Sequence, residues 1–475
     1  MSIALWWTRG AREVSSTSRR ILLAISLGLG ALSLHLLHTW SRQVRDLAFA
    51  AALAEVSQHT SVDRGVVLPL FDNIALLGAS LLMELRHLAV LLPVEIPHCG
   101  DLSNAHKSLL HKVDGRSPDA GSARLFIYDV CEEAAKAVVG GSWTHRPLFC
   151  DDLAHCRRRF RSFDLKVLSV VFSRFREVML LDADTLFFQT PSGLWDSLAF
   201  QSSGTLFFHD RIALPFRFLA QRPRKGIAKG NIHEFLEGFN PKPYTAILTV
   251  QPSDSPFVPK SRRVYVNSLS FAPSEFLLSS HSWALRSGHQ ADSSLLLWDK
   301  GRQRRATAIL ASLVSLNGEP RPNSYGDKEL YWLACELAEA EYSFSPFAVG
   351  SIGRHQKKAE GGDSVLCGDA MHFLPTHRGR PEDAPPLFIN SDNFAVWDLE
   401  DDTSEPLFRT AARPAEVYVG SQEERGLEME CIFDVKVLSL RREEIELVKR
   451  RQSLLAEAET VLDSVKKETS QPPRT

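Results

Sequence analysis

The sequence has few cysteines, no acceptor sequon for N-linked glycans, no internal repeat and no sustained run of basic residues. Seven cysteines among 475 residues are too few for a disulfide scaffold, and the odd number leaves at least one without a partner in the same chain. Cys150 and Cys156 are close enough in sequence to pair across a short loop. The net charge of -2 does not indicate nucleic-acid binding, and we interpret the one short basic cluster, residues 157–159, as a solvated loop. The composition is that of a globular protein, long enough for one large domain or two.

A long apolar run is present near the amino terminus. Residues 21–40 contain no Asp, Glu, Lys or Arg and are about as many as a membrane-spanning helix needs. Arg9, Arg12, Arg19 and Arg20 precede the run, so the positive-inside rule predicts a cytosolic amino terminus and a luminal remainder. A cleaved signal peptide is the alternative, but the run is longer than a typical signal-peptide core and no clear cleavage site follows it. We therefore expect a single-pass type II membrane protein with an uncleaved signal anchor.

The rest of the chain alternates strand-like and helix-like segments. The apolar run at residues 74–92 carries Glu84, Arg86 and His87, and each charge would cost about 2.5 to 3.5 kcal/mol in a membrane, so we predict a helix packed on the core. Consecutive βα units are expected over residues 64–188, which predicts an α/β fold with a mostly parallel central sheet flanked by helices. Further strands are predicted at 204–208, 294–298 and 387–389, helices at 304–314, 328–340 and 441–467, and a loop at 350–362.

These segments predict five parts of the chain. The last of them is amphipathic, and we expect it to dock on its own domain, with a weak coiled-coil seam as the alternative. The predicted parts are a cytosolic tail (1–20), a transmembrane signal anchor (21–40), a stem (41–65), a catalytic domain (66–430) and a C-terminal amphipathic helix with a polar tail (431–475).

Two carboxylates follow one of the predicted buried strands. Residues 178–181 are apolar and lead directly into Asp182 and Asp184, as in a parallel strand that delivers side chains to the carboxyl edge of a sheet. Such a pair suits a divalent metal bound to a nucleotide diphosphate, although it could also cap the next turn. Phosphatases of the haloacid dehalogenase type share an Asp-x-Asp motif, but here Thr185 comes one residue too early and Leu186 occupies the Thr/Val position.

Further blocks accompany the acidic pair in a fixed order. Together they resemble the catalytic core of the fungal Golgi α-mannosyltransferases of glycosyltransferase family 71, which are α-1,3-mannosyltransferase-like. The resemblance extends from about residue 74 to 393. Its blocks are residues 92–95, 166–175, 177–184, 204–211, 292–300 and 325–332, with Asn317 before the last of them.

The resemblance implies a GT-A-type nucleotide-sugar transferase fold, GDP-mannose as the donor, Mn²⁺ as the cofactor and retention of the α configuration. It implies that Asp184 and Asp182 hold the metal, directly or through the nucleotide's ribose. His372 matches the position of a third metal ligand, with His377 as the alternative because the intervening loop is longer than in the family.

The resemblance also implies substrate contacts. Lys166 and Arg211 would steady phosphate or the carboxylates nearby, and Lys328 belongs to a Gly-Asp-Lys-Glu block that we expect at the substrate. Asp292 and Asp327 are candidates for contacting the transferred sugar or positioning the acceptor hydroxyl. Asp327 could also cap the predicted helix that follows it.

The function expected from these features is metal-dependent, retaining transfer of mannose from GDP-mannose to a glycan hydroxyl, in protein glycosylation at the Golgi membrane. Ser294 and Phe388 depart from the family pattern, which leaves the acceptor and the linkage open. A related hexosyltransferase that uses a UDP-sugar, and an inactive membrane-anchored homologue that binds glycans, are the alternatives. The expected partners are the nucleotide-sugar donor and a glycan or glycoprotein acceptor, with a homo-oligomer or a transferase complex as a further association.

Overall fold

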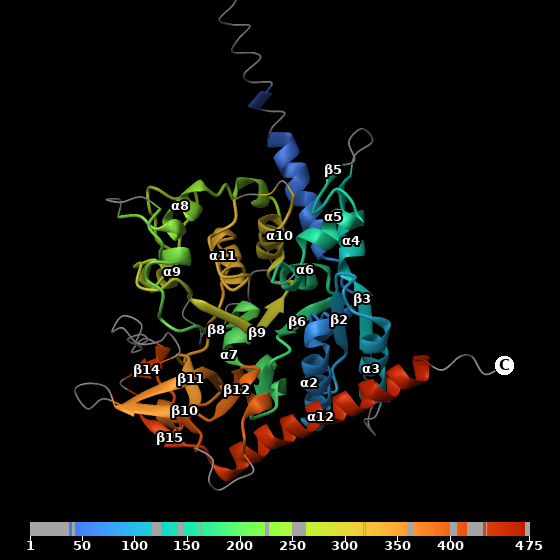
Figure 1. Cartoon of the computed structure of the whole chain (residues 1–475). Coiled ribbons are helices and arrows are strands. Elements are labelled where there is room, and N and C mark those ends of the chain that lie inside the picture. Colours follow the sequence, from blue (N-terminus) through green and yellow to red (C-terminus); the bar gives the residue numbers. More distant parts are fainter. Residues whose placement is uncertain are drawn as a thin grey trace, which may run out of the picture. The chain divides into compact units, whose positions relative to one another are not determined.

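The computed structural model describes residues 38–39, 43–115, 125–140, 146–161, 163–223, 228–248, 263–316, 318, 320–358, 364–399, 406–415, 431–433 and 435–470 (Figure 1). The chain divides into two compact units, residues 1–49 and 50–475. In the first unit, residues 43–49 are helical, and the predicted signal anchor at 21–40 lies outside the described residues except for positions 38 and 39. None of the helices described has both the length and the apolarity needed to cross a bilayer.

A six-stranded sheet forms the centre of the second unit, in the order β3-β2-β1-β6-β9-β8. Its strands are β1 (Val62–Val67), β2 (Val94–His98), β3 (Leu125–Asp129), β6 (Phe175–Leu181), β8 (Thr205–His209) and β9 (Ala291–Asp299). The first four strands in this order run parallel, and β9 is antiparallel to both of its neighbours. The structure therefore confirms the predicted α/β fold with a mostly parallel sheet. β1 begins at Val62, so the sheet starts four residues before residue 66, where the catalytic domain was predicted to begin.

The strand order changes direction between β1 and β6. After β1, the strands β2 and β3 are added on one side of β1, and β6 pairs with β1 on its other side. In open α/β sheets, ligands bind at the carboxyl ends of the strands where the order reverses in this way. The carboxyl end of β6 is Leu181, so Asp182 and Asp184 lie at this edge.

The predicted helices form around the sheet. The run at 74–92 is a helix, α2 (Ala75–His87), with its leucines in the core, as predicted. Asp129 ends β3 and caps α4 (Val130–Lys136) by accepting bonds from the Cys131 and Glu132 amides. The other helices are α3 (Asn104–Asp114), α5 (Leu153–Arg159), α6 (Asp164–Phe172), α7 (Leu198–Ser203), α8 (Asn231–Gly238), α9 (Glu275–Ser279), α10 (Arg304–Leu313), α11 (Leu330–Leu337) and α12 (Arg442–Ser470).

A second sheet was not predicted from the sequence. Its order is β15-β13-β10-β11-β12-β7, with β14 beside β11. The segment 350–362 was predicted as a loop, but Gly350–Lys358 is strand β10, so the prediction was wrong. Gly353 of β10 allows the neighbouring strand to approach closely, because a Cβ at this position would lie only 2.3 Å from the carbonyl oxygen of Cys367. The remaining strands are β7 (Thr185–Phe187), β11 (Ser364–Phe373), β12 (Pro386–Asn390), β13 (Phe408–Thr410), β14 (Cys431–Phe433) and β15 (Val437–Ser439), and β4 (Val138–Val139) pairs separately with β5 (Arg146–Pro147).

The last helix, α12, packs against α2 and α3, as Figure 1 shows. Val448, Leu454, Ala458 and Leu462 lie on its apolar side and are buried in the core. The predicted amphipathic helix is therefore confirmed, and it docks on its own domain.

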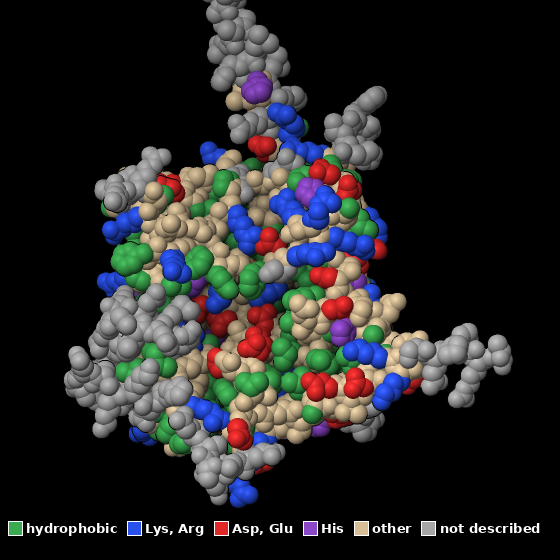
Figure 2. Space-filling view, viewed as in Figure 1, with side chains coloured by type: hydrophobic (Ala, Val, Ile, Leu, Met, Phe, Trp, Pro, Cys, Tyr) green, Lys and Arg blue, Asp and Glu red, His purple; other side chains and the backbone are tan. Residues whose placement is uncertain are grey.

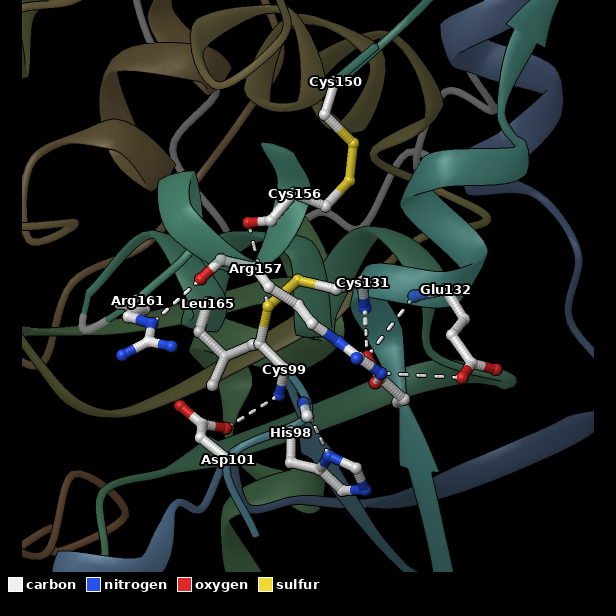
Figure 3. The surroundings of a disulfide bond; sticks show 12 residues. His98, Cys99, Asp101, Cys131, Glu132, Cys150, Cys156, Arg157, Arg161 and Leu165 are labelled. Carbon is white, nitrogen blue, oxygen red and sulfur yellow. Dashed lines mark hydrogen bonds and ion pairs between the residues drawn. A yellow bond between two sulfur atoms is a disulfide. The ribbon is translucent and has the colours of Figure 1, made fainter. Parts of the chain in front are cut away.

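Three disulfides are formed, and Cys335 is free and buried. The predicted Cys150–Cys156 pair is one of them; the others join Cys99 to Cys131 and Cys367 to Cys431. Figure 3 shows the first two disulfides, with Arg157 beside them. Arg157 of α5 forms an ion pair with Asp129 at 2.6 Å. The basic cluster at 157–159 is thus the last turn of α5 rather than a loop, because Arg157 is held by this ion pair.

Candidate functional site

The loop that carries the acidic pair is fixed through its backbone. The Asp182 amide donates to the Ser294 carbonyl oxygen of β9 at 2.8 Å, and the Thr185 amide turns back to the Asp182 carbonyl at 3.2 Å. Arg451 of α12 donates to the Ala183 carbonyl at 3.0 Å. The arginine is fully buried and also faces Glu84 of α2 at 3.6 Å. The docked tail helix therefore positions the loop between the two carboxylates.

Lys166 of α6 neutralises carboxylates at this edge. Its Nζ lies 2.9 Å from Asp182 and 3.3 Å from Asp327, and it donates to both the carbonyl and the hydroxyl of Ser293 at 3.0 Å. Burial favours the neutral amine, but the neighbouring carboxylates outweigh it and raise the pKa of Lys166. Lys166 therefore stays charged and steadies carboxylates, which was one of the two predicted roles.

Asp327 lies in the same cluster. It is fully buried, and Ser293 donates to it at 3.3 Å. The helix that follows, α11, begins at Leu330 with Glu329 as its cap residue, so the predicted capping role for the Asp327 side chain is wrong. Its side chain belongs to the lysine cluster instead.

Asp184 has a different partner, Asn390. With its amide nitrogen turned toward the carboxylate, Asn390 at the end of β12 donates to both Asp184 oxygens, at 2.9 and 3.2 Å. Burial and the charge of Asp182 raise the pKa of Asp184 to about 7. Burial also raises the pKa of Asp182, despite the contact with Lys166. The pair therefore lies in surroundings that are short of positive charge.

His372 of β11 is buried beside the sheet. Its Nε2 lies 2.9 Å from Asp292, and its ring stacks on Phe388 with a centroid distance of 4.6 Å. Burial raises the pKa of Asp292, but the bond to His372 outweighs burial and the net pKa is lowered. His372 and Asp292 thus form a buried pair. His377, the alternative ligand, lies 3.2 Å from the Arg380 carbonyl oxygen.

The predicted three-ligand set is not assembled in this structure. Within the described part of the chain, only one group of three His, Cys, Asp or Glu residues brings its ligand atoms close together, namely Cys99, Asp129 and Cys131. Two of these are joined in a disulfide, so that cluster is structural. Asp182 and Asp184 share the loop, whereas His372 is engaged with Asp292, and its role as a metal ligand stays a prediction.

The remaining predicted residues lie toward β8. Lys328 contacts Asp210 at 2.6 Å, and the Arg211 side chain donates to the Gly368 carbonyl oxygen of β11 at 2.7 Å. Arg211 therefore joins the two sheets. The sequence interpretation missed Asp210, although it follows the buried strand β8 just as Asp182 follows β6, and it missed Asn390.

A pocket of about 260 Å³ opens between β1 and β6 at the switch point. One wall is apolar and comes from the segment after β1, from α2 and from the start of α6; the other is polar. The apolar residues are Pro69, Phe71, Ile74, Leu77, Phe163 and Leu165, and the polar ones include Lys166, Asp182 and Asp184. Figure 2 shows acidic side chains gathered in a hollow near the middle of this face, where Figure 1 shows β6, β8 and β9. The pocket thus combines a flat apolar surface with paired carboxylates.

Comparison with known proteins identifies the family. Residues 63–374, more than half of the chain, match the family model described as "Mannosyltransferase putative", so the chain belongs to this mannosyltransferase family. The match confirms the resemblance predicted from the sequence blocks.

Among curated proteins, the chain is 25% identical over 359 residues to "Putative alpha-1,3-mannosyltransferase MNN15" of Candida albicans, covering 71% of this chain and 42% of that protein. It is 23% identical over 313 residues to "Alpha-1,3-mannosyltransferase MNN1" of Saccharomyces cerevisiae, covering 62% of this chain and 36% of that protein. The chain thus spans less than half the length of these relatives.

Solved glycosyltransferases are similar only at a distance. The bifunctional glycosyltransferase WbbM has 13% identity and a TM-score of 0.31, covering 60% of this chain and 39% of that one. Mouse xyloside xylosyltransferase 1 has 11% identity and a TM-score of 0.27, covering 58% of this chain and 82% of that one. These scores are too low to support an argument about the site.

Proposed function

We propose that the protein is a metal-dependent, retaining glycosyltransferase of GT-A type that moves mannose from GDP-mannose to a glycan hydroxyl and forms an α-mannosyl linkage. The observation that carries the proposal is the acidic pair beside the switch-point pocket in a chain of the mannosyltransferase family. The proposal includes a single-pass type II anchor in the Golgi membrane, with the catalytic domain in the lumen. The names of the fungal relatives favour mannose as the transferred sugar.

The pocket fits the nucleotide part of such a donor. Its apolar wall offers Phe71 and Phe163 to a flat base, and its position at the switch point suits a nucleotide in an open α/β sheet. The diphosphate would then extend toward the carboxyl end of β6, where the acidic pair lies.

A divalent cation fits the acidic pair. Asp182 and Asp184 offer the hard oxygen ligands that Mn²⁺ and Mg²⁺ accept, and their raised pKa values support the proposal, because a bound cation would favour the ionised carboxylates. Asp184 would hold the cation and Asp182 would be shared between the cation and the ribose. When bound, the cation would neutralise the charge of the leaving diphosphate.

The chain's own residues would orient the reaction. Lys166 holds Asp182 at 2.9 Å and Asn390 holds Asp184, so both carboxylates are fixed before the donor enters. Asp327 contacts Lys166 and Asp292 contacts His372, and in this proposal the two carboxylates contact the transferred sugar or position the acceptor. No protein nucleophile is required, because the leaving diphosphate can accept the proton of the incoming hydroxyl on the same face of the sugar.

The proposal is tested by nucleotide release. The full chain, purified in detergent, is supplied with GDP-mannose, UDP-glucose or UDP-galactose, with and without Mn²⁺. Release of GDP that depends on Mn²⁺ and on GDP-mannose is the expected result. Release of UDP would identify the related hexosyltransferase, and no release from any donor would favour the inactive glycan-binding homologue.

A further inference from the structure

A second, larger pocket lies at the same edge of the sheet. Its volume is about 530 Å³, and it opens at the carboxyl end of β8, on the other side of β9 from the acidic pair. His209 and Asp210 reach it from the end of β8, Gln290 from just before β9, and Phe276 and Phe344 from the covering segments. None of these five residues has a role in the function proposed above.

Three aromatic rings in mutual contact form one wall of this pocket. The His209 and Phe344 rings have centroids 4.7 Å apart and are inclined by 25°, Phe276 packs on Phe344 at 4.7 Å and 14°, and the His209 and Phe276 centroids are 6.3 Å apart. All three side chains are only partly buried. An apolar aromatic wall with a few polar groups is typical of small-molecule sites, and it suits the C–H face of a pyranose ring.

Gln290 provides an unpartnered polar group in the pocket. The residue is 6% exposed, and its Oε1 is buried and has no hydrogen-bond partner in the part of the chain that the structure describes. Its backbone is fixed, because its amide donates to Glu329 at 3.0 Å and its carbonyl accepts from Asp210 at 3.1 Å. A buried amide oxygen without a hydrogen bond is unfavourable, so a ligand hydroxyl that donates to Oε1, with the side chain turned into the pocket, would be favoured.

The polar groups of the pocket are largely neutral. Burial lowers the pKa of His209 to about 4 and also lowers the pKa of His281, so both imidazoles are uncharged at neutral pH. The charge of Asp210 is matched by Lys328 at 2.6 Å. Arg286 also lines the pocket and adds hydrogen-bond donors. Uncharged imidazoles and a guanidinium group suit the hydroxyls of a neutral, polyhydroxylated ligand.

The pocket lies within reach of the acidic pair. β6 and β8 are both hydrogen-bonded to β9, so their ends are two strand spacings apart, roughly 10 Å. The Asp182 amide donates to the Ser294 carbonyl oxygen, and the Asp210 amide donates to the Gln290 carbonyl oxygen. Both loops therefore lie beside the start of β9. A sugar held in the pocket could therefore present a hydroxyl to a donor that extends from β6.

We propose that this pocket binds the acceptor glycan as a neutral hexose, with its C–H face on the His209–Phe344–Phe276 rings and one hydroxyl bonded to Gln290 Oε1. The inference rests on the proposed function, because it assigns the second substrate of that reaction. It adds the place and the chemical class of the acceptor.

The test separates acceptor binding from donor use. Methyl α-mannoside and α-mannobiose serve as acceptor probes for the full chain and for Gln290→Ala and Phe344→Ala. Each variant is expected to raise the acceptor KM by about tenfold or more while Kd for GDP stays within about twofold of wild type. Phe163→Ala, in the other pocket, is expected to weaken GDP binding and leave the acceptor KM unchanged. Gln201→Ala is the matched control, because this glutamine is on α7 and outside both pockets.

Ligand-detected NMR with α-mannobiose gives a readout that does not need turnover. Loss of the signal in Gln290→Ala and Phe344→Ala, but not in Gln201→Ala, supports the acceptor site even if GDP-mannose is not the donor. Binding or an acceptor KM equal to wild type in both pocket variants overturns the inference, and so does absence of binding to the wild type at millimolar probe. Failure of GDP release alone instead counts against the proposed function.

Discussion

Two clusters of carboxylates lie on the same sheet edge, and their surroundings differ. At the end of β6, burial raises the pKa values of Asp182 and Asp184 although Lys166 is near. At the end of β8, the pKa values of Asp210 and Asp292 are lowered, because Lys328 and His372 outweigh burial. The first cluster is short of positive charge and the second is balanced. The difference supports the proposal that a cation binds at the end of β6.

The largest expected effect is on Lys166, the only cation in contact with the first cluster among the described residues. Lys166→Met would leave the half-buried Asp182 and the fully buried Asp327 without a cationic partner, and we expect a loss of about 3–5 kcal/mol in the free energy of unfolding. Denaturant titration of the full chain in detergent measures it.

Lys328→Met sharpens this comparison. Lys328 contacts one carboxylate, Asp210, so its loss should cost less than that of Lys166. Adding Asp327→Asn to Lys166→Met should restore part of the stability because it removes one unpaired charge. Equal costs for the two lysines would show that the clusters are not electrostatically different.

Lys300, a third buried lysine, tests how burial alone changes the pKa of a lysine that has no carboxylate partner. Lys300 is fully buried and donates only to backbone carbonyls, those of Val171 and Ser173, and burial lowers its pKa to about 7. Between about pH 7 and its ordinary pKa of 10.5, the unfolded state binds more protons, so this lysine makes stability rise with pH in that window.

The slope from Lys300 is expected to be at most about 1.4 kcal/mol per pH unit. Lys300→Met should remove it, which denaturant titrations at several pH values between 7 and 10 will show. Lys166 has a raised pKa, so its stabilising contribution is present throughout this window and is lost only at higher pH. An unchanged slope in Lys300→Met would contradict the assignment.

The smallest expected effect is on Asn390. Asn390→Ala removes the amide that orients Asp184, at a cost of about 1–3 kcal/mol in transition-state stabilisation if the carboxylate loses its position. We expect a lower kcat and weaker Mn²⁺ activation with an unchanged acceptor KM. Ser391→Ala, at the neighbouring position, is the control, and a fall in activity equal to that of Asn390→Ala would indicate a general effect on the strand end.

The parallel half of the fold could be predicted because its signals are local. Apolar runs followed by turns defined β3 and β6, and charges within residues 74–92 excluded a second membrane span. The second sheet could not be predicted, because Gly353 and Gly368 suggest a loop by composition but in fact permit two strands to approach closely.

The site, like the fold, could be predicted only where its signals are local. Asp182 and Asp184 follow an apolar strand and could be found, whereas the contacts of Asn390 and Arg451 depend on chain segments more than 200 residues away. His372 was predicted beside the acidic pair, but its partner Asp292 is fixed by the pairing of distant strands. No local sequence signal shows whether His372 lies beside the acidic pair or beside Asp292.

The central claim is that Asp184 and Asp182 hold a divalent cation. Calorimetric titration of Mn²⁺ into the full chain with saturating GDP tests it directly, comparing wild type with Asp184→Asn. Asp299→Asn is the matched control, because Asp299 is buried at the opposite end of β9. We predict Mn²⁺ binding to wild type and to the control, and a loss of affinity of at least about 100-fold in Asp184→Asn, equivalent to about 2.8 kcal/mol. Equal Mn²⁺ affinity in wild type and Asp184→Asn would contradict the account.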